Sequence, residues 1–216
     1  MEDEVAAQQV RIKGRPRVLT NEVILRAALR AFAEAGFEAM SVRGLNASLG
    51  LSHEAVSQRF GSKRSLYFAA LDFGFADFFA AVAKERATRP APVDDLGELR
   101  EAIRTFMAAA SVTPELGRLV NHEGLAASER LDYIVEHAFE PRTRVLADLT
   151  HRLTDAGLIR PISAREIFFL AQAGAAPFTI AALSATFDPI DGPLDPAAHI
   201  DRVTDVIVQG LLDLPS

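Results

Sequence analysis

The chain has 216 residues, 49% of them hydrophobic, which is enough to bury one large core or two smaller ones. It contains no cysteine, so disulfide frameworks and thiolate metal sites are excluded. We find no apolar run of transmembrane length and no signal-peptide segment, and we therefore expect a cytoplasmic protein without a membrane partner.

The formal net charge of −6 is distributed unevenly along the chain. Residues 1–10 carry −3, residues 11–64 carry +6 and residues 65–216 carry −9. A basic N-terminal quarter on an acidic body is expected when only that quarter approaches phosphate. On charge alone, a solvated basic surface explains the pattern equally well.

Apolar periodicity in the first quarter predicts three short helices, at about 20–35, 41–49 and 52–60. The residues expected to cap their starts are Thr20, Ser41 and Ser52. Gly36 is expected to end the first helix, so that Phe37 folds back onto it. A small three-helix core is predicted from Val42, Leu45, Leu49, Val56 and Phe60.

The rest of the chain is also helical in pattern, which predicts an all-α fold of about nine helices. A helix at about 63–87 is aromatic on more than one face, so we expect it to join the N-terminal unit to a larger body. The remaining helices are expected at about 95–110, 113–127, 128–156, 163–183 and 195–212. Pro141 is expected to kink the 128–156 helix, and 185–195 to form a loop.

The 52–60 helix carries the candidate DNA-reading surface. Val56 and Phe60 are four residues apart and face inward, which leaves a polar set outward: His53, Glu54, Ser57, Gln58 and Arg59. Gln can pair with adenine and Arg with guanine or phosphate, whereas Glu can accept from cytosine or repel the DNA backbone. Helix starts favour phosphate, so the flanking candidates for DNA contact are Ser41, Arg43, Ser52 and Lys63.

A basic segment precedes these helices. Arg15 and Arg17 lie in a Gly-Arg-Pro-Arg string, and such an extended arm can enter an A·T-rich minor groove. Taken alone, the string is more typical of a disordered basic tail that only improves solubility. Its position directly before two short helices favours the DNA-binding reading.

Residues 20–73 resemble the DNA-binding domain of the tetracycline-repressor (TetR) family of bacterial regulators. The matching segments are ILRAALRAFAEAGFEAMSVRGL, ASLGLS and FGSK. The resemblance implies a basic arm over 1–19, a helix-turn-helix domain over 20–66, and a helical ligand-binding and dimerisation domain over 67–216. Ser57 replaces a common aromatic phosphate contact of this family, and Gly44 replaces the usual acid, so no operator sequence is carried over.

The last two predicted helices are too apolar for the surface of a monomer, which favours a homodimer. The expected interface residues are Phe168, Phe169, Ala173, Ala176, Ile180, Val203, Ile207 and Leu211. One large monomeric core is the alternative. The resemblance also implies a pocket for a small, largely apolar inducer. Its candidate residues, for each of which plain core packing is the more common role, are Phe75, Phe79, Phe106, Met107, His122, Tyr133, His137, Phe139 and Gln172.

These features predict a transcriptional repressor that binds a double-stranded, (pseudo)palindromic operator and is released by the inducer. Activation instead of repression, and a helix-turn-helix architectural protein without a ligand, remain alternatives. An enzyme is the competitor from another class. The sequence lacks the common hydrolase, metalloprotease and nucleotide-binding motifs, so we expect no catalytic residues, no metal and no cofactor.

Overall fold

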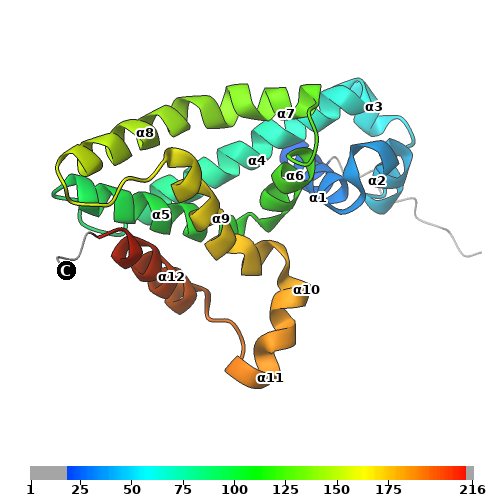
Figure 1. Cartoon of the computed structure of the whole chain (residues 1–216). Coiled ribbons are helices and arrows are strands. Elements are labelled where there is room, and N and C mark those ends of the chain that lie inside the picture. Colours follow the sequence, from blue (N-terminus) through cyan, green and yellow to red (C-terminus); the bar gives the residue numbers. More distant parts are fainter. Residues whose placement is uncertain (1–18, 213–216) are drawn as a thin grey trace, which may run out of the picture.

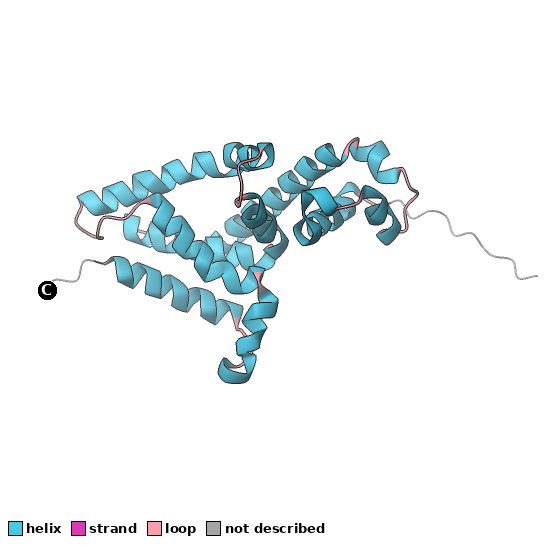
Figure 2. Cartoon of the chain, turned by 45° about the vertical axis from the view of Figure 1, so that its right-hand side comes forward, coloured by secondary structure: helices cyan, strands magenta, loops and turns pink. Residues whose placement is uncertain are grey.

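The computed structural model describes residues 19–212, and these fold almost wholly into helices (Figures 1 and 2). The N-terminal part consists of α1 (Asn21–Ala39), α2 (Val42–Ser48), α3 (Ala55–Phe60) and the long α4 (Lys63–Arg86). The body contains α5 (Asp95–Val112), α6 (Pro114–Glu123), α7 (Glu129–Ile134), a π-helical turn η1 (Val135–Phe139), α8 (Glu140–Asp155), α9 (Ala164–Thr179), α10 (Ala181–Ser184), a 3-10 turn η2 (Ala185–Phe187), α11 (Asp188–Asp191) and α12 (Pro196–Leu211). The all-α prediction is confirmed.

Side-chain caps begin most of the predicted helices. Thr20 accepts a hydrogen bond from the Val23 amide, and Ser41 accepts one from the Gly44 amide. Ser163 and Glu166 form the predicted capping box at the start of α9. These contacts satisfy amides that a helix leaves unbonded in its first turn, which is why short-range sequence signals located these starts well.

The prediction for the start of α3 was wrong. The helix begins at Ala55, and Glu54 stands at its cap position without a side-chain hydrogen bond. Residues 52–54 instead belong to the turn between α2 and α3. The Asn46 side chain holds this turn from within and replaces the expected Ser52 cap.

Gly36 breaks the helical path of α1, with a φ of 74°. This conformation suits glycine and lets Phe37 fold back, as predicted. The Phe37 ring stacks near Phe32, with centroids 6.1 Å apart, and meets the edge of Tyr67 at 5.2 Å. The end of α1 is thereby held against α4.

Two buried clusters organise the molecule. The first joins α1–α4 and also contains Leu116, Leu119 and Ile134 from α6 and α7. The second is formed by α5, α8, α9 and α12. Helix α4 packs against both α1 and α5, so it joins the two parts as expected. Gly74 lies where α4 meets Leu29 and Leu116, whose methyl groups leave little room for a side chain.

Helix α4 is long and apolar enough to cross a membrane, judged by length and composition, contrary to the expectation that no segment reaches that limit. In this fold it packs against α1, α3, α5 and α6. Its apolar composition therefore has a structural cause, because the helix presents side chains to neighbours on several sides.

Two expectations for the body were wrong, and the interruption expected at Pro141 takes a particular form. The 113–127 helix ends at Glu123, because residues 124–128 form a turn. The expected kink at Pro141 is a π-turn, in which the Glu140 amide bonds to the Val135 carbonyl. A wider turn just before a proline accommodates the missing amide hydrogen at this point.

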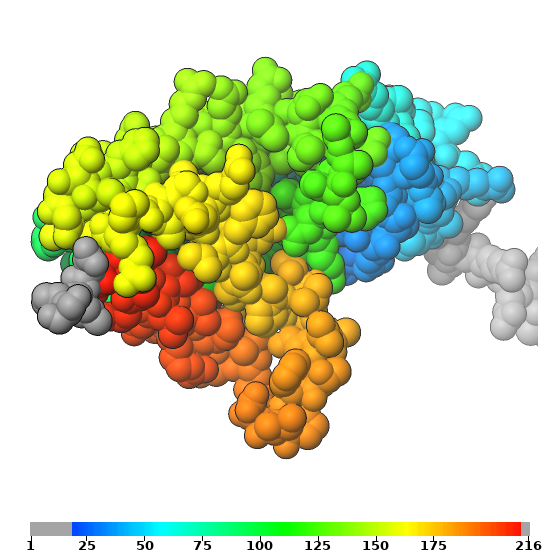
Figure 3. All heavy atoms as spheres, in the orientation of Figure 1, coloured from blue at the N-terminus to red at the C-terminus, as the bar shows by residue number. Residues whose placement is uncertain are grey.

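The second error concerns the 163–183 helix and the loop after it. Helix α9 stops at Thr179, two residues after Pro177, and the chain turns by 78° before continuing through α10, η2 and α11. Much of the expected 185–195 loop is thus helical. Pro189 is compatible with this because it lies in the first turn of α11, where a missing amide costs nothing. This segment projects from the body, beside α12 (Figures 1 and 3).

Candidate functional site

The turn between α2 and α3 is built on Asn46, a fully buried residue that the sequence analysis did not single out. Its side-chain amide donates to the His53 carbonyl at 2.9 Å, and its oxygen accepts from the Val56 amide at 3.1 Å. A buried carboxamide satisfied at both ends holds the two helices in one relative position. The only sequence signal was a polar residue at an inward position next to Leu45.

The polar face predicted for α3 is exposed. The solvent-accessible residues of the turn and helix are Ser52, His53, Glu54, Ser57, Gln58 and Arg59, whereas Val56 is buried. The Gln58 amide lies 3.4 Å from the Glu54 carboxylate, across one helical turn. The face thus offers donors and acceptors on a short helix anchored from behind.

Two basic candidates have partners within the fold. The Arg59 guanidinium donates to the Leu19 carbonyl, just before α1. The Lys63 ammonium donates to the Glu38 carbonyl at 2.9 Å and lies over the Phe37 ring at 5.0 Å. Both residues hold the N-terminal unit together, a role that their sequence positions did not indicate.

The other basic candidates differ in their surroundings. Arg43 is exposed in the first turn of α2, and its side chain makes no ion pair within residues 19–212. Ser41 stands beside it as the cap of α2. Arg15 and Arg17 lie outside the described residues.

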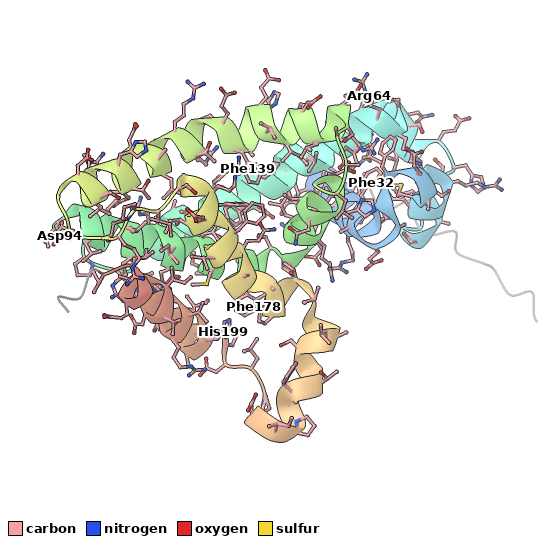
Figure 4. The ribbon with its side chains drawn as sticks, viewed as in Figure 1. Phe32, Arg64, Asp94, Phe139, Phe178 and His199 are labelled. Carbon is pink, nitrogen blue, oxygen red and sulfur yellow. The ribbon has the colours of Figure 1, made fainter. Side chains whose placement is uncertain are left out.

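A cavity of about 530 Å³ opens between α4, α5, α6, α8 and α9. Five of the nine predicted pocket residues line it: Phe75, Phe79, Phe106, Phe139 and Gln172. Figure 4 shows Phe139 between α8 and α4. Most of the surface that faces the cavity is apolar, and aromatic rings from several helices supply much of it.

The other four predicted pocket residues lie elsewhere. Met107 is buried in the second cluster, under Gly174. His122 is exposed, with its ring near Gly36. The Tyr133 hydroxyl donates to Asp72 at 2.7 Å, and the exposed His137 ring stacks on Tyr133.

Several cavity residues were missed because they come together only in the folded chain. Phe78 and Arg142 face the cavity from α4 and α8. Phe168, predicted at the dimer interface, lines it as well, and its ring meets Phe106 and Phe139 with centroids 5.8 and 5.2 Å away. Helical periodicity alone could not separate an inward cavity position from an outward interface position.

The other predicted interface residues divide into two groups. Ile207 and Leu211 are only 8% and 4% exposed, so they belong to the core of the single chain, and Val203 is half-buried against Gly174. Phe169 and Ile180 are 59% and 50% exposed. Ala173 is exposed and Ala176 half-buried on the same helix, α9.

A buried ionic cluster links the N-terminal unit to the body. The Glu123 carboxylate, 4% exposed, accepts from the Tyr67 hydroxyl at 2.9 Å and from Arg130 Nε at 2.9 and 3.0 Å. The Arg130 guanidinium also lies over the Phe37 ring, 4.6 Å from its centroid. Burial, followed by the bond to Glu123, raises the pKa of Tyr67 well above its usual range. The pair of Glu123 on α6 and Arg130 on α7 thus contacts Tyr67 on α4 and Phe37 at the end of α1.

Glu123 follows His122 directly, but its carboxylate is not free to bind a metal ion, because it is occupied by Tyr67 and Arg130. Within residues 19–212 no three His, Cys, Asp or Glu side chains converge as a metal site would require.

Comparison with known proteins finds a family match for the N-terminal helices. Residues 24–70 match the family model described as "Bacterial regulatory proteins, tetR family". Over 91 residues the chain is 29% identical to YezE of Bacillus subtilis (strain 168), described as an uncharacterized HTH-type transcriptional regulator. That match spans 42% of this chain and 43% of the relative, so it covers less than half of either protein.

Solved structures share the whole fold. HlyIIR, a hemolysin II transcriptional regulator, superposes with a TM-score of 0.61 at 20% identity, covering 89% of this chain and 97% of that chain. KstR2, a ketosteroid transcriptional regulator of Mycobacterium tuberculosis, gives 0.63 at 18% identity over 92% and 98%. AibR, solved with isovaleryl coenzyme A and operator DNA, gives 0.59 at 20% identity over 88% and 96%.

Proposed function

We propose that this chain, whose residues 24–70 match the tetR-family model, is a transcriptional repressor that binds operator DNA and releases it when a small molecule fills its cavity. The observation that carries the proposal is the exposed polar face of α3, fixed from behind by Asn46 and Val56. A short, rigidly held helix with outward polar side chains suits the DNA major groove.

Within this proposal the residues around α3 have three roles: contact with bases, contact with phosphate and support of the helices. Ser57 and Gln58 face the base edges, whereas Arg43 and the start of α2 face phosphate. Arg59 and Lys63 have internal partners, so we assign them first to holding α3 and α4 in position. The arm residues Arg15 and Arg17 remain candidates for the minor groove.

We propose that the active form is a homodimer, because one helix-turn-helix reads only half of a (pseudo)palindromic operator. Large apolar side chains are exposed on the surface of α9–α12 and the segment between them: Phe169, Leu170, Ile180, Leu183, Phe187, Ile190, Leu194 and Val206. A monomer seldom leaves such a set in water. We also propose that the chain consists of a basic arm over 1–19, a helix-turn-helix domain over 20–66 and a ligand-binding and dimerisation domain over 67–216. The first buried cluster crosses the second boundary, since it extends from α1–α4 into α6 and α7.

The cavity supports a ligand-responsive regulator over an architectural protein without a ligand, which would need no such space. Its volume falls within the range of small-molecule sites. Helix α4 lines it and also contacts α3, so a ligand that prefers one position of α4 would shift the distance between the two reading helices of a dimer. AibR, with the same fold, was solved with both a small molecule and operator DNA.

DNA retention at increasing salt concentration tests whether α2 and α3 bind DNA. Replacing a side chain that neutralises one phosphate lowers the salt dependence of binding by about one unit of slope. We expect this for Arg43→Ala. Arg144→Ala is the matched control, since Arg144 lies on α8 and pairs with the exposed Glu140. Equal salt slopes for the two variants and the unchanged protein would contradict the assignment.

The remaining alternatives need different measurements. A reporter gene placed behind a DNA fragment that the protein binds separates repression from activation, because its expression falls in the first case and rises in the second. Turnover of generic ester substrates by the purified protein, abolished by a substitution in the cavity, would instead favour an enzyme.

A further inference from the structure

One basic side chain at the cavity lacks a carboxylate partner. Arg86 pairs with Glu98, and Arg152 pairs with Asp95 at 2.7 Å, so these two cavity-lining cations are neutralised. Arg142 forms no ion pair within residues 19–212. It is therefore the cavity-lining arginine that has charge to offer a ligand.

The surroundings of Arg142 are apolar on one side. Its guanidinium carbon lies 3.4 Å from the centroid of the Phe79 ring, and one amino group donates to the Ala138 carbonyl at 2.9 Å. Loss of water lowers the pKa of Arg142. The remaining donors of this planar, forked group are those that a carboxylate pairs with most strongly.

A second polar feature of the cavity is an amide pair formed by Asn121 on α6 and Gln172 on α9. The Gln172 amide donates to the Asn121 side-chain oxygen. The Gln172 oxygen is buried and has no hydrogen-bond partner in the described structure. A buried acceptor without a donor is costly in a folded protein, so a hydrogen-bond donor on the ligand would be favoured at this point of the cavity.

The cavity between these groups is elongated and aromatic. Its lining on α4 extends from Phe75 to Arg86, which corresponds to about 16 Å along a helix. Phe79, Phe106 and Phe168 supply rings along the walls. A chain or flat ring system fits this arrangement better than a compact polar molecule.

We propose that the cavity binds an elongated amphipathic carboxylate, whose anionic head pairs with Arg142 while its apolar part lies among the phenylalanine rings. The inference rests on the proposed function only in treating this cavity as the inducer site. Binding itself needs no DNA and can be measured on the protein alone.

The test compares three probes with a ten-carbon chain by titration calorimetry, each below its micelle concentration or solubility limit: decanoate, decanol and decyltrimethylammonium. We expect the unchanged protein to bind decanoate at least about tenfold more tightly than either of the others, since a charge-assisted hydrogen bond is worth that much. Equal binding of decanoate and decanol would overturn the proposal.

Variants locate the head group. Arg142→Gln should weaken decanoate binding by about 10- to 100-fold and leave decanol binding unchanged. Arg142→Lys should retain part of the preference, which keeps the test valid if the neutral variant folds poorly. Arg144→Gln is the matched control on the same helix, because Arg144 does not line the cavity. Identical decanoate affinities for Arg142→Gln and Arg144→Gln would also overturn it.

DNA retention, measured without any probe, separates this inference from the proposed function. If decanoate fails to bind while DNA retention is intact, the ligand class is wrong and the regulator stands. If decanoate binds through Arg142 while DNA is not retained, the ligand class stands and the regulator is wrong.

Discussion

Asn46 shows how one buried polar side chain can fix the orientation of the exposed face of α3. It donates to the turn before α3 and accepts from the first turn of that helix. Because the bond from the Val56 amide is buried, water cannot replace the side chain there. The orientation of α3 therefore depends on a residue of α2.

We expect Asn46→Ala to lower the free energy of unfolding by about 2–4 kcal/mol, because it leaves the His53 carbonyl and the Val56 amide without partners. DNA affinity should fall as well, since α3 loses its fixed position. Urea unfolding and a DNA titration measure the two effects. Gln58→Ala, on the exposed face, should alter DNA binding with little change in unfolding. Equal stabilities for Asn46→Ala and Gln58→Ala would refute this role.

The two tyrosines of the chain, Tyr67 and Tyr133, both donate to carboxylates. Burial and then the bond to Asp72 raise the pKa of Tyr133 to about 12, and burial and Glu123 raise that of Tyr67 further. In the unfolded chain both hydroxyls ionise near pH 10. The neutral forms are thus preferred by the folded protein.

The folded protein should therefore show little tyrosinate absorbance at pH 10.5, where the urea-unfolded chain shows that of both residues. Because both pKa values are raised on folding, their contribution to stability is complete below about pH 10 and is lost as the pH rises above it. Tyr133→Phe should remove the lower of the two native titration steps. A native titration midpoint near pH 10 for both tyrosines would disprove the assignment.

At the scale of residues, the outward set on α3 could be predicted because Val56 and Phe60 fix its inward side by spacing alone. The internal hydrogen bonds of Arg59 and Lys63 could not be predicted from the sequence. Arg59 reaches a carbonyl 40 positions away and Lys63 one 25 positions away, and long side chains carry no sequence signal of such partners.

At the scale of elements, α9 depends on one glycine. A side chain at Gly174 would meet both Met107 on α5 and Val203 on α12 at 2.7 Å. His199 on α12 also approaches the Gly174 carbonyl at 2.8 Å and faces Phe178, as Figure 4 shows. Close approach at this position joins three helices of the second cluster.

Gly174→Ala should destabilise the fold by about 1–3 kcal/mol, because the added methyl group overpacks the junction. Gly210→Ala is the matched control. Gly210 lies in the last turn of α12 with open space around it, so alanine there should be neutral or stabilising by up to about 1 kcal/mol. Thermal unfolding of both variants gives the comparison, and equal shifts would contradict the packing argument.

Helix starts and the helical class were predictable because capping and periodicity are local. Interruptions were less so. The π-turn just before Pro141 is one such interruption, and the break at Ile180 places α10 and α11 at a steep angle to α9. Pro and Gly in 185–195 suggested a loop, although Pro189 falls in a first turn that tolerates it.

At the scale of the molecule, the segment α10–α11 projects beside α12 (Figure 3). This segment and the exposed side of α9 carry exposed apolar side chains. A second copy of the chain covering this surface would bring two reading helices into one particle. The sequence identified the apolar helices, but only the fold separates side chains that fill the core, such as Leu211, from those that remain exposed, such as Phe169.

Phe169→Glu should therefore convert the dimer to a monomer of 23.4 kDa and weaken operator binding, since each half-site then binds alone. Sedimentation equilibrium measures the mass. Val93→Glu, which changes a side chain that is 97% exposed before α5, is the control and should leave the dimer intact. A monomer for the unchanged protein at micromolar concentration would argue against the dimer.

The central claim is that the exposed side chains of α3 read DNA sequence. Selection of bound fragments from a genomic library tests it most directly, with the unchanged protein and Gln58→Ala side by side. We predict that the unchanged protein enriches a two-fold symmetric motif whose half-sites lie about one helical turn apart, and that Gln58→Ala changes the preferred base within each half-site. The account would be contradicted if no motif were enriched. It would also be contradicted if the preferred bases stayed the same in Gln58→Ala and in variants substituted at Ser57 and His53.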